Sequence, residues 1–176
     1  MRDSYVDDFF TLLRFPSIST DDAYKERLAE CAHWLVEKLN GIGLDAQLVS
    51  TAGHPVIWAK NKHEPGRRTV MLYGHYDVQP PDPLELWDSP PFDPVLKNGY
   101  VYARGATDNK GQILAHILGI QETLEEGGDL PVNLLWATNV PPPLAGELMF
   151  ELSEAAQQVI YDSLGWKDPA HDLVAT

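Results

Sequence analysis

An apolar run that ends in a glycine and leads straight into a histidine and an aspartate is the feature that most constrains this chain. Residues 70–73 form the run, Gly74 ends it, and His75 and Asp77 follow. If the run is a buried strand, its period of two sends His75 and Asp77 to the same side. Both then lie where the strand opens into a loop, the usual place for sites in open α/β sheets. The pattern predicts an α/β fold with a site at the end of this strand.

His75 is the strongest single candidate for a metal ligand in the chain. Asp77 is close enough in sequence to accept a hydrogen bond from the other ring nitrogen, which would fix the tautomer of His75. The alternative is a turn in which both side chains face water, since so short a spacing recurs by chance. A second motif is needed to decide between these two interpretations.

That motif lies at residues 99–111, which read Gly-Tyr-Val-Tyr-Ala-Arg-Gly-Ala-Thr-Asp-Asn-Lys-Gly. The strand-like run is broken by Gly105, and Asp108 stands just before an expected helix. Trp87 and a Pro-Phe pair at residues 91–92 lie between the two motifs. The whole pattern resembles zinc metallopeptidase family 20, which includes carnosinases and other dipeptidases, glutamate carboxypeptidases and succinyl-diaminopimelate desuccinylases. The resemblance is collinear over about residues 5–136.

The resemblance leans toward the dipeptidase branch and implies a centre of two zinc ions. In it, His75 binds one ion, Asp108 bridges both, and Asp77 is the catalytic-site residue that orients His75. The peptide bond between Asp108 and Asn109 is expected to be cis. The implied reaction is hydrolysis of the amide bond of a small peptide substrate. The metal ions polarise the carbonyl and activate a water, and a glutamate takes the proton of that water.

The resemblance stops after Trp136, where the family has a cluster of glutamates that supplies the general base and a metal ligand. Here three prolines follow at residues 141–143, and they mark a linker or a sharp change of direction. We therefore predict two parts: residues 1–136 as the N-terminal part of a metallopeptidase catalytic domain, without the lid domain, and residues 137–176 as a divergent Pro-rich linker and amphipathic helix. The apolar residues of that helix step by three and four: Leu148, Leu152, Ala155, Ala156, Val159, Ile160 and Leu164.

Glu147, Glu151 and Glu154 lie in the same segment, but their spacing differs from that of the family's glutamate pair. We interpret them as the solvated face of the amphipathic helix. His171 is a lone histidine near the end of the sequence, and we do not expect it to be a ligand. The general base, its neighbouring ligand, a later carboxylate and a late histidine therefore have no match in this sequence.

The hydrophobic pattern predicts a mixed sheet flanked by helices. Apolar residues at helical spacing and the positions of Gly and Pro set the expected bounds. The helices are expected at residues 4–13, 21–40 and 111–126, and strands at residues 44–49, 55–59, 69–73 and 131–136. A hairpin is expected at residues 95–103, and an ordered loop without regular secondary structure, near the site, at residues 80–94.

Several conspicuous side chains have structural roles as their simplest interpretation. Cys31 lies on the apolar stripe of its helix and is expected in the core, whereas His33 is expected at the surface. His116 lies near the apolar face of the last helix of the resemblance, and packing is favoured over ligation. Arg104 and Lys110 could anchor a substrate carboxylate, but their places in the motif suit structural roles better.

Composition excludes some classes of partner. The chain has a net charge of −13, and its 13 lysines and arginines are scattered, so it offers no basic patch for nucleic acid. No apolar stretch reaches the length of a transmembrane helix, and no membrane partner is expected. The N-terminal residues lack the apolar core of a signal peptide, and Cys31 alone forms no internal disulfide. We therefore expect a cytoplasmic protein.

Two hypotheses from different classes follow. In the first, the chain is a zinc-dependent metallopeptidase, a dipeptidase-like amide hydrolase by resemblance, and it is incomplete as it stands. In the second, it is a noncatalytic remnant that acts as a binding or interaction module, for example by forming a homo-oligomer through an uncovered surface. The zinc content per chain separates the two hypotheses, because a working centre of this family holds two ions.

Overall fold

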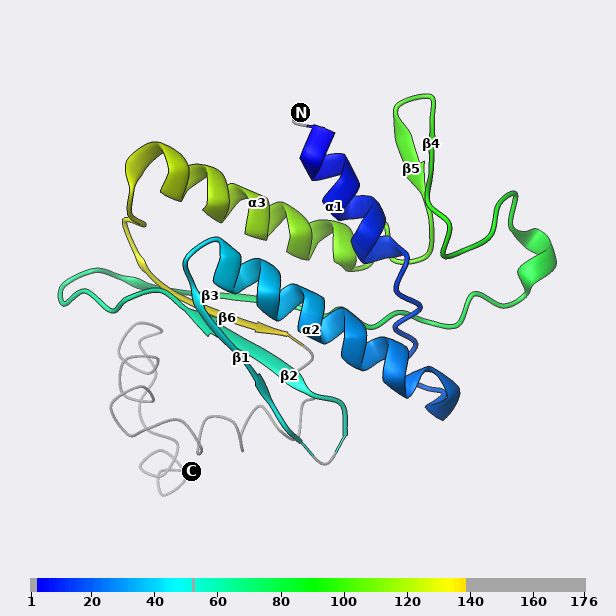
Figure 1. Ribbon diagram of the computed structural model, residues 1–176, viewed down its shortest axis with the longest axis horizontal. Coiled ribbons are helices and arrows are strands. Elements are labelled where there is room, and N and C mark those ends of the chain that lie inside the picture. Colours follow the sequence, from blue (N-terminus) through cyan, green and yellow to red (C-terminus); the bar gives the residue numbers. More distant parts are fainter. Residues whose placement is uncertain (1–2, 52, 139–176) are drawn as a thin grey trace, which may run out of the picture.

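A computed structural model describes residues 3–51 and 53–138 of the chain. These residues form a mixed sheet with helices packed against it, as Figure 1 shows, and the predicted fold class is confirmed. Each predicted helix and strand lies within a few residues of an observed one. The elements are α1 (Asp3–Leu13), the 3-10 turn η1 (Asp22–Tyr24), α2 (Lys25–Gly41), β1 (Asp45–Val49), β2 (Val56–Lys60), β3 (Thr69–Gly74), the 3-10 turn η2 (Leu84–Leu86), β4 (Val95–Lys97), β5 (Tyr100–Tyr102), α3 (Lys110–Gly127) and β6 (Asn133–Thr138).

The main sheet has the strand order β1-β2-β6-β3. The β1/β2 and β2/β6 pairs are antiparallel, whereas β3 and β6 are parallel. Parallel neighbours need a crossover connection, and α3 forms the helical part of the connection from β3 to β6. After β3 the chain passes through a loop and the β4/β5 hairpin and comes back to the end of that strand. The N-terminus of α3 therefore lies near the end of β3. This topology is what brings the two sequence motifs together.

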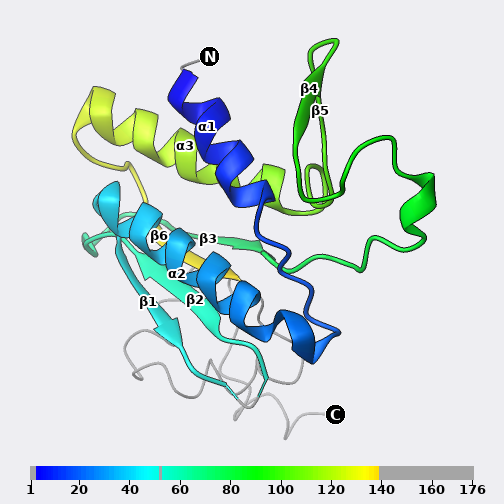
Figure 2. The same ribbon diagram turned by 45° about the vertical axis from the view of Figure 1, so that its right-hand side comes forward.

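Helices α1, α2 and α3 all lie on one side of the sheet in both views (Figures 1 and 2). Helix α2 packs on β1 and β2, while α3 lies over β3 and also contacts α1. Cys31 is fully buried in this layer and His33 is exposed, as the sequence predicted. The largest members of the core between helices and sheet are Leu12, Leu28, Leu35, Leu39, Ile57, Tyr76, Ile113, Ile117 and Trp136.

Three sequence predictions need correction. His116 is exposed rather than packed, because the buried stripe of α3 passes through Ile113 and Ile117 instead. Helix α2 begins at Lys25, later than expected, because Asp21 caps a 3-10 turn by accepting a hydrogen bond from the Ala23 amide. The Pro-rich loop of residues 80–94 includes the short helical turn η2.

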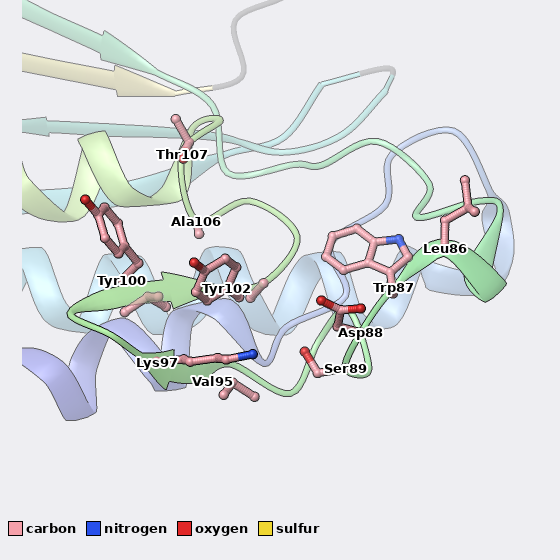
Figure 3. A pocket seen from close by; sticks show the side chains of 12 residues that line it. Leu86, Trp87, Asp88, Ser89, Val95, Lys97, Tyr100, Tyr102, Ala106 and Thr107 are labelled. Atoms are coloured by element: carbon pink, nitrogen blue, oxygen red, sulfur yellow. The ribbon is translucent and has the colours of Figure 1, made fainter.

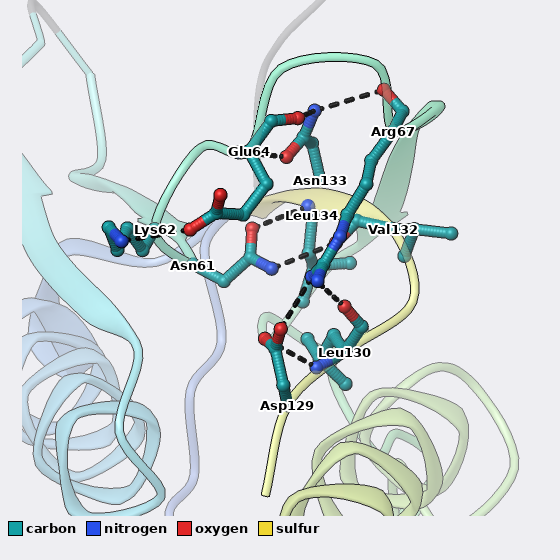
Figure 4. A network of polar contacts seen from close by, with 9 residues as sticks. All are labelled: Asn61, Lys62, Glu64, Arg67, Asp129, Leu130, Val132, Asn133 and Leu134. Atoms are coloured by element: carbon teal, nitrogen blue, oxygen red, sulfur yellow. Dashed lines mark hydrogen bonds and ion pairs between the residues drawn. The ribbon is translucent and has the colours of Figure 1, made fainter.

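A network of polar contacts holds the start of β6 (Figure 4). The Asn133 side chain accepts a hydrogen bond from the Glu64 amide at 2.8 Å and donates to the carbonyls of Glu64 and Arg67, each at 3.1 Å. Asn61 accepts from the Leu134 amide at 2.8 Å. Asn133 is 4% exposed, so these bonds satisfy backbone groups that would otherwise be buried without a partner.

Within the described part of the chain, no helix is both long enough and apolar enough to span a bilayer. The linker and helix predicted for residues 137–176 lie almost entirely outside the described residues, as do Glu147, Glu151, Glu154 and His171.

Candidate metal site

The two motifs meet at the end of β3. His75 is the first residue after this strand, and Asp108 precedes α3 by two residues. The Nε2 atom of His75 lies 3.1 Å from Oδ1 of Asp108. The two side chains therefore converge, and the sequence prediction that they share one end of the sheet is confirmed.

The other ring nitrogen of His75 faces Asp77. Nδ1 lies 3.1 Å from the Asp77 carbonyl oxygen and 3.2 Å from its Oδ1 atom. Both of these atoms are acceptors, and two acceptors at Nδ1 against one at Nε2 favour a proton on Nδ1 when the ring is neutral. The Nε2 lone pair then points at the Asp108 carboxylate. The tautomer expected from the His-x-Asp spacing is the one that this geometry favours.

This arrangement fits a metal ion. In neutral His75, the Nε2 lone pair and the Asp108 oxygen are both acceptors, so they repel unless a proton or a cation lies between them. Two ligand atoms at about 2 Å from a tetrahedral zinc ion lie about 3.3 Å apart, close to the observed 3.1 Å. The side chains of Asp108 and His75 are 83% and 35% exposed, so an ion could reach them from solvent.

Asp77 is itself held by a neighbouring segment. Its Oδ2 atom accepts a hydrogen bond of 2.6 Å from the Ser19 hydroxyl. The backbone of residues 17–19 runs beside that of residues 76–78, through an isolated parallel bridge between Ile18 and Val78 and a 2.9 Å bond from the Val78 amide to the Ser17 carbonyl. The segment before α2 therefore fixes the carboxylate that orients His75.

Asn109 fixes the backbone of the same histidine. Its Oδ1 atom accepts a hydrogen bond of 3.1 Å from the His75 amide. The peptide bond between Asp108 and Asn109 is cis, as the resemblance implied. Gly74 leaves room for this contact, because a Cβ atom there would lie 2.7 Å from Asn109 Oδ1 and 2.2 Å from a methyl group of Ile113.

Lys110 lies beneath the site as a buried cation. It is fully buried, and its Nζ atom donates to the carbonyls of Leu12 at 3.1 Å and Phe15 at 2.6 Å. Burial lowers the pKa of its ammonium group to about 8. Lys110 therefore ties the start of α3 to the end of α1, which confirms the structural role expected from its place in the motif.

Arg104 also has a structural role. Its guanidinium donates to the Pro80 carbonyl at 3.2 Å and lies over the Trp87 ring, 5.2 Å from the ring centroid. These contacts join the second motif to the Pro-rich loop.

Two ligands do not complete a metal site. Among the residues that the structure describes, no group of three or more His, Cys, Asp or Glu side chains could hold an ion. His75 and Asp108 are the pair that converges, with Asp77 behind the ring.

A hollow of about 600 Å³ lies beside the site but does not include it (Figure 3). It is formed by the loop of residues 86–89, the β4/β5 hairpin and Thr107. Tyr100 and Tyr102 on the hairpin are 69% and 50% exposed. Neither His75 nor Asp108 lines this hollow, so it is no part of the candidate metal site.

Sequence reasoning assigned no site role to Ser19 or Asn109. The Ser19 hydroxyl bonds to a carboxylate 58 positions away in the sequence. No local pattern carries that signal. Asn109 lies inside the second motif, so the motif itself could have identified it.

Two family profiles match the chain. The profile of peptidase family M20/M25/M40 matches residues 71–140. That of the glucose-6-phosphate dehydrogenase subunit N-terminal domain matches residues 110–176, so the two overlap over residues 110–140.

Curated relatives agree with the first profile. The Cys-Gly metallodipeptidase dug1 of Schizosaccharomyces pombe is 30% identical over 145 residues, which cover 76% of this chain and 30% of the relative. The succinyl-diaminopimelate desuccinylase of Bordetella avium is 34% identical over 168 residues, covering 92% of this chain and 42% of the relative. The chain thus spans less than half the length of these two curated relatives.

Solved structures of similar proteins share the fold. Human carnosine dipeptidase 1 superposes with a TM-score of 0.79 at 26% identity, over 89% of this chain and 37% of that one. The dipeptidase Dug1p of Saccharomyces cerevisiae gives a TM-score of 0.74 at 27% identity, over 84% of this chain and 35% of that one.

Proposed function

The chain belongs to peptidase family M20/M25/M40, and on that premise we propose that His75 and Asp108 form part of the zinc centre of a dipeptidase-like amide hydrolase. The observation that carries the proposal is the 3.1 Å approach of His75 Nε2 to Asp108 Oδ1, with Asp77 on the opposite ring nitrogen. The substrate class is a dipeptide or a similarly short N-acyl amino acid, because the relatives include dipeptidases and a desuccinylase.

Each residue has a distinct role in this proposal. His75 would supply a neutral nitrogen ligand to the metal, and Asp108 would supply a carboxylate ligand. Asp77 accepts a hydrogen bond from the Nδ1–H group of His75. This bond keeps the Nε2 lone pair directed at the ion and raises the basicity of the ring. Ser19 and Asn109 are positioning residues that hold Asp77 and the His75 backbone. When bound, the metal ions polarise the scissile carbonyl and lower the pKa of the attacking water.

The described residues provide only part of this machinery. Catalytic zinc ions usually keep three protein ligands, and the sequence motifs supply His75 and Asp108 for the whole centre. The general-base glutamate of the family has no match in the sequence, and such a base typically contributes on the order of 10²–10⁴ in rate. We therefore expect weak zinc binding and negligible dipeptide hydrolysis by this chain alone.

The test is dipeptide turnover by the full chain with added zinc, beside Asp108→Asn and Glu147→Ala variants. Asp93→Asn is the matched control, because Asp93 is an exposed loop acid away from the site. We expect no turnover above background in any of them. Robust turnover that Asp108→Asn abolishes and Asp93→Asn leaves intact would overturn the expectation of an incomplete site. If Glu147→Ala also abolished this turnover, the result would show that residues 139–176 complete the site.

A second candidate function, that of a noncatalytic binding module, has one observation in its favour. Residues 110–176 match the N-terminal domain of a glucose-6-phosphate dehydrogenase subunit, and the partner of such a module would be a glucose-6-phosphate dehydrogenase. Size-exclusion chromatography of the full chain mixed with a purified dehydrogenase of this kind tests the candidate. Co-elution would support a binding module, and separate elution would contradict it.

A further inference from the structure

The main sheet has a second face that no described helix covers. Helices α1, α2 and α3 lie on one side of it in both ribbon views (Figures 1 and 2). Ile57 and Trp136 point toward those helices, because both belong to the core cluster. Side chains alternate along a strand, so the neighbours of these two residues point to the second face.

That second face is apolar across three strands. Trp58 of β2 is paired with Ala137 of β6, and Ala137 is paired with Tyr73 of β3. The next row holds Leu135 beside Met71. These five residues form what we call the outer patch. Sheets with parallel pairs are normally covered on both faces in α/β domains, because each face must bury its apolar side chains.

Burial within the outer patch is uneven. Trp58 is 6% exposed and Ala137 is fully buried, although no described helix lies on their face. Met71 and Tyr73, on the edge strand β3, are 42% and 56% exposed. The centre of the patch therefore behaves as an interior surface, whereas its β3 side is open.

We propose that residues 139–176 of the same chain pack on the outer patch. Strand β6 lies between β2 and β3, and the chain leaves it at Thr138, next to Ala137 of the patch. The prolines at residues 141–143 prevent the strand from continuing and favour a change of direction. The segment therefore starts at the patch that needs a cover and is tethered to it covalently.

The sequence of this segment suits the surface. Its apolar residues, from Leu148 to Leu164, step by three and four, while Glu147, Glu151 and Glu154 fall on the other side. A helix over residues 148–164 would be about 25 Å long at 1.5 Å per residue. Typical strands of five or six residues span roughly 17–20 Å, so one such helix is long enough to cross the face.

A comparison supports the same arrangement independently of the metal site. The profile of the glucose-6-phosphate dehydrogenase subunit domain runs without interruption over residues 110–176. Helix α3, strand β6 and the segment beyond them therefore fall within a single profile match. This favours packing within the chain over packing on a second copy.

Cysteine cross-linking in the full chain tests the proposal. Tyr73→Cys is combined in turn with Leu148→Cys, Leu152→Cys and Ile160→Cys, and treated with a short bis-maleimide. The matched control combines Leu152→Cys with His116→Cys, since His116 is exposed on α3 on the other side of the sheet. The native Cys31 is fully buried and stays in place, and the Tyr73→Cys single variant checks that it does not react.

We expect an intramolecular link from Tyr73→Cys to at least one partner, in yield on the order of tenfold above the control pair, as effective concentration in a docked tether demands. Equal yields in both pairs would overturn the proposal. Products of dimer size alone would also overturn it, because they would place a second copy on the outer patch.

Hydrogen exchange gives a second readout. The double variant Leu152→Asp with Ile160→Asp should raise amide exchange in β3 and β6 by on the order of tenfold or more, because it removes the cover of the patch. Exchange in α2 should stay unchanged. The matched control Glu151→Gln should change neither region. Unchanged exchange in β3 and β6 of the double variant would contradict the proposal.

Discussion

His75 is fixed at three points, and each point is a separate residue. Asn109 holds its backbone amide, Asp77 faces Nδ1, and Asp108 faces Nε2. Asp77 in turn accepts a hydrogen bond from the hydroxyl of Ser19. The orientation of the ring thus depends on four side chains, and of these only Asp108 would contact a metal ion.

Ser19→Ala tests this indirect control. The variant frees one oxygen of Asp77, so we expect zinc affinity to fall by on the order of tenfold, the lower end of typical losses when an outer-shell partner is removed. Competition with a chromophoric chelator measures the affinity. Thr20→Ala, at an exposed neighbouring position, is the control and should leave the affinity unchanged. Equal affinities for Ser19→Ala and Thr20→Ala would contradict the role given to Ser19.

Lys110→Met tests the buried tie between α1 and α3. The substitution keeps an apolar chain of similar length but leaves the carbonyls of Leu12 and Phe15 without their donor. We expect the free energy of unfolding to fall by about 2 kcal/mol, a typical cost of unsatisfied buried acceptors. Urea denaturation provides the measurement, with Lys25→Met as the control at an exposed site. Equal urea midpoints for the two variants would contradict the structural role given to Lys110.

Gly74→Ala tests the close packing between β3 and α3. The new methyl group would overlap Ile113 and Asn109, so we expect a loss of about 1–3 kcal/mol from overpacking. Gly119→Ala is the same substitution within α3, where a Cβ atom meets nothing within 4 Å. It should stabilise the protein by about 0.5–1 kcal/mol, because alanine favours helix. Opposite shifts in thermal midpoint are expected, and shifts of the same sign would count against this explanation.

At the scale of elements, hydrophobic periodicity predicted α2, α3, β2 and β6 because these elements bury their apolar side chains. Strand β3, expected to be buried, is instead exposed at Val70, Met71 and Tyr73. The Asn98–Gly99 pair is typical of a tight hairpin turn, and in the β4/β5 hairpin both residues adopt positive φ values, 53° and 81°. Helix α2 started later than predicted because Asp21 satisfies a local 3-10 turn. His116 was misplaced because a histidine beside an apolar stripe can lie on either side of the boundary of that stripe.

Asn133→Ala tests how β6 is anchored. The variant removes three hydrogen bonds to the backbone of residues 64 and 67, so we expect a loss of about 1–3 kcal/mol in chemical denaturation. Asp129→Ala is the contrast, because its ion pair with Arg67 is exposed to solvent. Such pairs contribute at most about 1 kcal/mol. A larger loss for Asp129→Ala than for Asn133→Ala would contradict the importance given to the buried amide.

At the scale of the whole molecule, the sequence predicted that His75 and Asp108 converge at one end of the sheet, but it did not predict the contacts that hold them there. His75 and Asp108 could be identified because each lies in a local motif. The bond from Ser19 to Asp77 joins residues far apart in sequence and follows only from the packing of one loop beside another. The sequence could not predict which face of the sheet the described helices leave uncovered, because coverage depends on how helices distribute between the two faces.

Zinc stoichiometry in the full chain distinguishes a partial metal centre from a complete one, and native mass spectrometry beside a chelator competition gives both the number of ions and the affinity. We predict at most one weakly bound ion per chain, lost in His75→Ala and in Asp108→Asn. The ion should be retained in His116→Ala and in Asp93→Asn, since both of those side chains are exposed away from the site. Two tightly bound ions per chain, or zinc binding that survives Asp108→Asn unchanged, would contradict the account.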